Sequence, residues 1–209
     1  MTQRTLSLAN RQLAMEIISG GTGLVLALFK WGHVVLVGSI LTGERGFNWL
    51  ATFLEDYYIA QPTVLAILFL FLVHAVFAAR KIPAQLAERK RLAELAGGLS
   101  NSGREKVETR TAHSPFRPHV ESMLWIWQVR TGFIILVLGS FHLVLIAIDI
   151  FTPLFGSIAG IESVSSMARV QAGLWLPYAI LLLCVEFHAS VGLYRLVIKW
   201  GADLWLSRA

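Results

Sequence analysis

Four histidines lie inside apolar stretches of this 209-residue chain, one in each stretch: His33, His74, His142 and His188. Imidazole is the commonest metal ligand among side chains. An ionisable side chain within a membrane-length apolar segment is rarely retained without a partner or a function. A lone buried histidine is more often a hydrogen-bonded packing residue, but one histidine in each of four segments favours the interpretation as ligands.

The elements that must position these histidines are apolar segments near residues 17–42, 62–82, 121–150 and 171–200. Each is near or above the roughly 20 residues that span a bilayer as a helix. Hydrophobic residues make up 56% of the chain and charged residues 15%. We therefore predict an all-α fold: one polytopic transmembrane bundle over residues 1–209, with four membrane-spanning helices and short interfacial helices. The first segment is too long for a signal-peptide core and is expected to be retained.

The net charge of +5 is unevenly distributed along the chain. Basic residues gather before the first segment, in the connection 83–120 and at the C-terminal end, whereas the first and third connections carry only Arg45 and Arg169. The positive-inside rule then places both termini and the connection 83–120 in the cytoplasm. Because topology explains the basic excess, we expect a bilayer and no nucleic acid as partner. The single cysteine, Cys184, excludes a disulfide within the chain and a cysteine-ligated iron–sulfur cluster.

Helix direction and rise sort the four histidines by depth. His74 and His188 each lie roughly 10 Å from the inner edge, whereas His33 and His142 lie nearer the outer edge. Two neutral imidazoles from facing helices suit six-coordinate haem iron, whereas zinc prefers three or four protein ligands at one level. We predict two haems in the bundle core, with His74 and His188 as the inner pair and His33 and His142 as the outer pair. A proton-coupled transporter without haem is the alternative from another class.

Several cations and polar side chains lie near the predicted inner haem. Lys81 follows the inner histidine of its helix by seven residues, and Arg195 and Lys199 follow theirs by seven and eleven. These spacings put each cation on the face of its histidine, where it could bind a haem propionate. Trp125 and Gln128 open the third segment near the inner interface, and Gln128 is included among the candidate surroundings of this haem.

Two carboxylates are the candidates for proton chemistry. Glu186 lies in the fourth segment but on a different helix face from the nearby histidine, so we exclude it from the ligands. Glu55 lies in the first outer connection. It is either a solvated loop charge or a proton acceptor at the outer face, and the residues alone leave both interpretations open.

A series of ordered motifs runs through nearly the whole chain. The motifs are TGL at 22–24, GH at 32–33, HA at 74–75, WIWQ..TGF at 125–133, GS.H at 139–142 and VEFH.SVGLYRL.IKWG at 185–201. In order and spacing they resemble the dihaem cytochrome b membrane-anchor subunit of quinol:fumarate reductases and succinate:quinone oxidoreductases. Members of that family commonly carry a fifth membrane helix after the KWG motif, whereas we expect four in this sequence.

The resemblance implies a place in the respiratory chain of a bacterial cytoplasmic membrane. Menaquinol would be oxidised near the outer haem, and electrons would pass through both haems to an iron–sulfur subunit and an FAD-containing flavoprotein subunit on the cytoplasmic side. The flavoprotein would reduce fumarate to succinate or run in reverse, and such heterotrimers could pair into dimers. The alternative within electron transfer is the cytochrome b subunit of a formate dehydrogenase, hydrogenase or nitrate reductase.

The resemblance also implies roles for single residues. Glu55 matches a glutamate needed at the quinol site, and Glu186 matches a glutamate assigned to a transmembrane proton route. Arg169 and Lys199 match positions associated with haem propionates, and Trp125 matches a position beside the inner haem.

Overall fold

The computed structural model describes residues 3–91, 94, 120–156 and 160–201. Over these ranges it is helical, without strands. The elements are α1 (Gln3–Gly38), the 3-10 helix η1 (Ser39–Thr42), α2 (Glu44–Asp56), α3 (Ala60–Ala79), α5 (Val120–Phe151), α6 (Ser163–Arg169), the π-helical segment η2 (Val170–Leu174) and α7 (Trp175–Lys199). Residues 82–91 are also helical and continue beyond α3. Most of the predicted cytoplasmic connection 83–120 lies outside the described residues.

Four of the described helical stretches are long and apolar enough to cross a membrane: Asn10–Thr42, Ala60–Arg91, Ser122–Phe151 and Ser163–Lys199. Large apolar side chains such as Leu28, Leu65 and Leu183 are exposed on three of these stretches. A hydrocarbon layer would cover such surfaces, and helices satisfy their own backbone hydrogen bonds there. The predicted all-α bundle with four membrane-spanning helices is confirmed.

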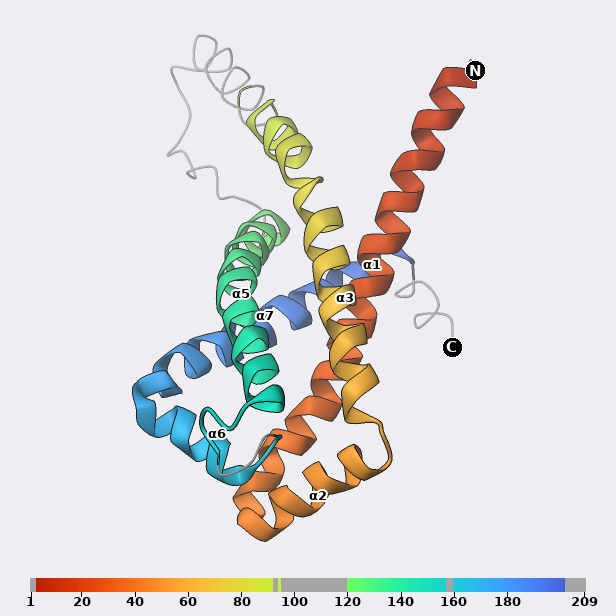
Figure 1. Ribbon diagram of the computed structural model, residues 1–209. Coiled ribbons are helices and arrows are strands. Elements are labelled where there is room, and N and C mark those ends of the chain that lie inside the picture. The colour runs from red at the N-terminus through yellow and green to blue at the C-terminus, as the bar shows by residue number, and fades with distance from the viewer. Residues whose placement is uncertain (1–2, 92–93, 95–119, 157–159, 202–209) are drawn as a thin grey trace, which may run out of the picture.

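The four long helices associate as two pairs. α1 packs against α3 and α5 packs against α7, and we call these the first and second helix pairs (Figure 1). Direct packing between the pairs is sparser and runs mainly through α1 and α7. Among the described residues few apolar side chains are buried; Ala27, Trp125 and Val191 are among them. Helix packing alone therefore does not join the two pairs through a continuous apolar core.

Two segments differ from the helix bounds expected from sequence. α1 begins at Gln3, so the chain before residue 17 continues the first membrane helix without a break. The first outer connection contains α2, which buries Phe47 and Ala51 and exposes Trp49 and Phe53. An amphipathic helix of this kind suits the edge of a membrane. Glu55 therefore lies on an amphipathic helix and not in a loop, and the packing of this helix determines its position.

α2 and α6 lie at one end of the bundle, away from the start of α1 (Figure 1). We call this the outer end, following the predicted topology, and the opposite one the inner end. The buried guanidinium of Arg169 in α6 donates a hydrogen bond to the buried carboxylate of Asp149 in α5. Gly173 adopts φ 89° just before α7. Pro177 has no N–H that could donate to the carbonyl oxygen of Gly173. The irregular segment and the ion pair together set where α7 begins.

Candidate functional site

The structure brings the four membrane-depth histidines together in the predicted pairs. The ring centres of His74 on α3 and His188 on α7 lie 6.3 Å apart, with the ring planes at 87°. Those of His33 on α1 and His142 on α5 lie 6.2 Å apart, with the planes at 60°. Each histidine pair therefore consists of one imidazole from the first helix pair and one from the second.

Both histidine pairs fit one metal ion held between two imidazoles. Two imidazoles that share an ion through bonds of about 2 Å each put their ring centres about 6 Å apart. In the described part of the chain, no group of three or more His, Cys, Asp or Glu side chains converges on a common point. Two axial nitrogens suit an iron whose other four ligands come from a porphyrin, so the donor set fits haem.

α1 forms a cradle for the inner histidine of α3. The Nδ1 atom of His74 lies 3.1 Å from the carbonyl oxygen of Ser19 and 3.3 Å from Oγ1 of Thr22. Donation from Nδ1 to the carbonyl leaves the lone pair on Nε2, the nitrogen that is then free to bind a metal. Gly23 lies against the same ring, because a Cβ there would be 2.9 Å from Cε1 of His74. The missing side chain lets the imidazole lie directly on the helix backbone.

α5 forms the same cradle for the inner histidine of α7. The Nδ1 atom of His188 lies 2.9 Å from the carbonyl oxygen of Gln128 and 3.4 Å from Oγ1 of Thr131. A Cβ on Gly132 would be 3.1 Å from Cε1 of His188. Both inner imidazoles are thus fixed by a carbonyl, a threonine and a glycine from the membrane-spanning helix that precedes their own.

The two cradles share a sequence pattern that reasoning from sequence missed. Thr22-Gly23 and Thr131-Gly132 are followed, eleven residues after each threonine, by His33 and His142. The pattern T-G-x9-H therefore appears in both α1 and α5, where it supplies a cradle for an inner histidine and then an outer histidine. Comparing the two halves of the sequence for equal spacing could have found it.

Aromatic contacts surround the outer histidine pair. Phe29 stacks on His33 with ring centres 5.6 Å apart, and Tyr178 meets His142 edge-on at 5.5 Å. The buried Nδ1 atom of His142 has no hydrogen-bond partner among the described residues. The outer imidazoles are therefore held by ring packing, whereas backbone carbonyls hold the inner ones.

The predicted cations of the inner haem gather at the inner end and already have protein partners. Lys81 donates to the Glu16 carboxylate at 3.2 Å, and Lys199 donates to the same oxygen. Arg195 donates to the side-chain oxygen of Gln128 at 2.8 Å. Sequence reasoning did not single out Glu16, the one carboxylate that connects α1 to both lysines.

Trp125 and Arg169 are both buried, but at opposite ends of the bundle. The indole N–H of Trp125 donates to the side-chain oxygen of Gln85 at 2.7 Å, near the inner end. Arg169 binds Asp149 and donates to Oγ of Ser166 at 3.1 Å, at the outer end. The structure therefore does not bring Arg169 together with the inner cations.

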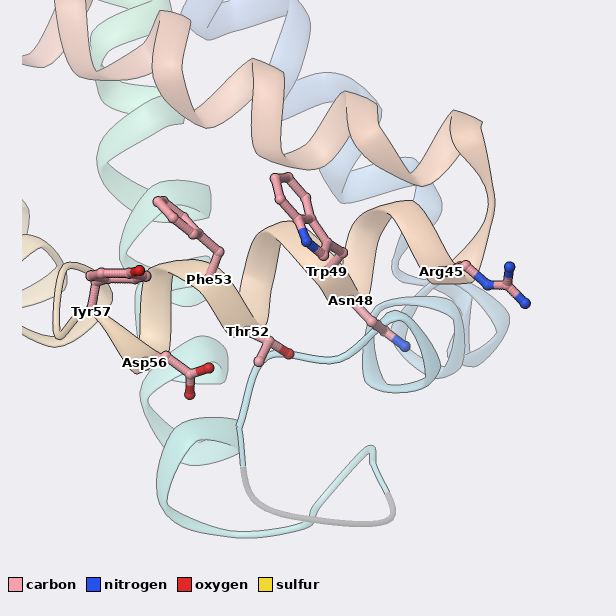
Figure 2. A pocket seen from close by; sticks show the side chains of 7 residues that line it. All are labelled: Arg45, Asn48, Trp49, Thr52, Phe53, Asp56 and Tyr57. Atoms are coloured by element: carbon pink, nitrogen blue, oxygen red, sulfur yellow. The ribbon is translucent and has the colours of Figure 1, made fainter.

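Glu55 lies on α2 at the outer end and is partly buried. Its Oε1 atom accepts a hydrogen bond of 3.2 Å from the backbone N–H of Ile161 in the segment before α6. The adjoining face of α2 borders a surface hollow of about 480 Å³. Figure 2 shows its lining side chains, which are those of Arg45, Asn48, Trp49, Thr52, Phe53, Asp56 and Tyr57.

Glu186 lies two residues before His188 in sequence, but its side chain contacts Lys30 and not a histidine. Its Oε2 atom accepts a hydrogen bond of 2.6 Å from Nζ of Lys30 on α1, which forms an ion pair. The predicted separation of this carboxylate from the histidine ligands agrees with that contact, because its partner is a cation on another helix.

Four membrane-spanning helices that hold two pairs of facing imidazoles define a multi-pass membrane protein of the cytochrome type. The succinate dehydrogenase/fumarate reductase transmembrane subunit family matches residues 104–208. A fumarate reductase cytochrome b subunit of Helicobacter pylori is 31% identical over 199 residues, which cover 90% of this chain and 67% of that protein. The subunit of the same name from Wolinella succinogenes is 33% identical over 188 residues, which cover 86% of this chain and 64% of that protein. The chain belongs to this family of membrane subunits.

We expect the substitution Gly23→Ala to reduce haem binding. The added methyl group would lie 2.9 Å from His74 unless that ring moves, and overpacking of this kind destabilises by about 1–3 kcal/mol. The measurement is haem per chain in the purified protein. Gly21→Ala is the matched control on the same helix, because nothing lies within 4 Å of its Cβ position. Equal haem content in the two variants would contradict the cradle.

Proposed function

We propose that this chain is the membrane-anchoring dihaem cytochrome b subunit of a quinol:fumarate reductase or succinate:quinone oxidoreductase. The proposal depends on the distance between the two rings of each histidine pair, which is 6.3 Å for His74 and His188 and 6.2 Å for His33 and His142. Membership of the transmembrane subunit family and the names of the relatives support it.

In this proposal each histidine pair would hold one b-type haem. Bound haem would supply reversible one-electron transfer. Lys81, Arg195 and Lys199 at the inner end could neutralise propionates of the inner haem, with rearrangement of the contacts to Glu16. Arg169 lies at the opposite end, and its charge could serve the outer haem.

Menaquinol is the proposed electron donor, and its oxidation releases two protons together with two electrons. Glu55 at the outer end is the proposed acceptor of a proton from the quinol hydroxyl, and its partly buried carboxylate is fixed by Ile161. A carboxylate within hydrogen-bond reach of a reacting hydroxyl is suited to general-base chemistry. Glu186 is the proposed residue of a transmembrane proton route that accompanies the electrons.

The proposed partners are an iron–sulfur subunit and an FAD-containing flavoprotein subunit. They would dock on the cytoplasmic side of a bacterial inner membrane, the side on which the distribution of basic residues predicts both termini and the connection 83–120. The dicarboxylate chemistry, in either direction, would take place on the flavoprotein. Two such heterotrimers could form a dimer.

The proposal is tested on the complex purified from its own membrane. We expect an iron–sulfur protein and a flavoprotein to co-purify, a b-type α-band to appear on reduction by dithionite, and a menaquinol analogue to drive fumarate reduction. Co-purification with the subunits of a formate dehydrogenase, hydrogenase or nitrate reductase would overturn the assignment. Absence of any haem band would favour a transporter.

We also expect Glu55→Gln to lower quinol-linked turnover by about 100-fold or more, in the range found when a general base is removed. Glutamine keeps an oxygen that can accept the hydrogen bond from Ile161, but it cannot take up a proton. Haem content should stay unchanged. Glu44→Gln is the control, because Glu44 is an exposed glutamate on the same helix. Equal turnover in the two variants would exclude Glu55 from the site.

A further inference from the structure

An ion pair connects α1 to α7 within their membrane-spanning stretches. Nζ of Lys30 lies 2.6 Å from Oε2 of Glu186, with side-chain exposures of 15% and 46%. Lys30 follows Glu16 by fourteen residues and Glu186 precedes Lys199 by thirteen, so the pair lies roughly 20 Å along the helices from the contact between Glu16 and Lys199. α1 and α7 are thus joined by ion pairs at two levels.

The Lys30–Glu186 ion pair, at the deeper level, is costly because it takes two charges out of water. Charged side chains in the membrane interior are rare and are usually paired or functional. Apolar residues of similar volume often replace an ion pair that is removed from water without loss of stability, so stability alone does not explain the Lys30–Glu186 pair. What the pair adds is a directional contact between two helices at one fixed position along each.

That contact bridges the two helix pairs, and so does each pair of histidines. Lys30 precedes His33 by three residues on α1, and Glu186 precedes His188 by two residues on α7. The ion pair therefore connects the helix of an outer histidine to the helix of an inner one. A shift between the two helix pairs would change the separation of imidazoles at both levels.

We propose that the Lys30–Glu186 ion pair is a clamp that holds the two helix pairs at the separation at which both histidine pairs can share a metal ion. Lys30 and Glu186 are positioning residues in this role and do not bind the metal. The inference rests on the proposed haem binding and adds to it a determinant of haem coordination that lies outside both histidine pairs.

The test uses the charge reversals Lys30→Glu and Glu186→Lys, singly and together, in the full chain purified with its partner subunits. Electron paramagnetic resonance measures the fraction of ferric haem that is five-coordinate and high-spin. We expect this fraction to rise in each single reversal, because one histidine of a pair no longer reaches the iron. The double reversal restores the ion pair and should return the haem to the low-spin form.

Two further variants keep the test decisive. Lys30→Met removes the cation without adding repulsion, so it serves as the test if a charge reversal fails to fold. We expect its high-spin fraction to exceed that of the unsubstituted protein but to be smaller than that of a folded single reversal. Reversal of Lys90 and Glu94 is the matched control, because those side chains are 80% and 67% exposed and form a pair of 4.0 Å. It should leave the spin state unchanged.

The possible results separate the clamp from the function on which it rests. The clamp is refuted if Lys30→Met and the single reversals keep fully low-spin haem, or if the double reversal behaves like the singles. It is also refuted if only the yield of protein falls while the remaining haem stays low-spin, since that result indicates a purely structural contact. Absence of haem from the unsubstituted protein would instead refute the proposed function.

Discussion

The separation between the two helix pairs is the constraint on which the rest of the structure depends. Each pair of facing imidazoles takes one ring from α1 or α3 and the other from α5 or α7. Direct packing between the helix pairs is sparse, so polar contacts carry much of the connection. They include the ion pairs of α1 with α7, the contact of Trp125 with Gln85, and the hydrogen bond from Ile161 to Glu55. The bundle is thus tied across at both ends and in its interior.

The two histidine levels differ in how the rings are held. The inner rings lie on glycine and donate to backbone carbonyls, whereas the buried Nδ1 atom of His142 has no hydrogen-bond partner among the described residues. Hydrogen bonding to an axial histidine and burial of the site are the means by which a protein tunes haem. The same T-G-x9-H pattern on α1 and α5 therefore yields two unlike sites, because each inner ring rests on a cradle and each outer ring packs against aromatic side chains.

Residue types and helix rise were enough to predict the four membrane helices and the histidine pairing, because the length of an apolar segment and the depth of a residue within it can be counted along the chain. Helix α2 was not predicted as a helix, since its amphipathic pattern is short and lies between two apolar segments. Three-dimensional partners were also missed. Glu16 forms an ion pair with a lysine, and Lys30 with a glutamate, on helices that are distant in sequence, so the contacts of both residues depend on the tertiary structure. The cradle glycines were visible as motifs, but their contact with imidazoles depends on how neighbouring helices are rotated.

We propose that the two histidine pairs bind two separate haems. Electron paramagnetic resonance of the oxidised complex, compared with its His74→Ala and His142→Ala variants, tests this most directly. We expect two low-spin ferric signals of equal weight per chain, with His74→Ala removing one and His142→Ala removing the other. A single low-spin signal, or loss of the same signal in both variants, would contradict it.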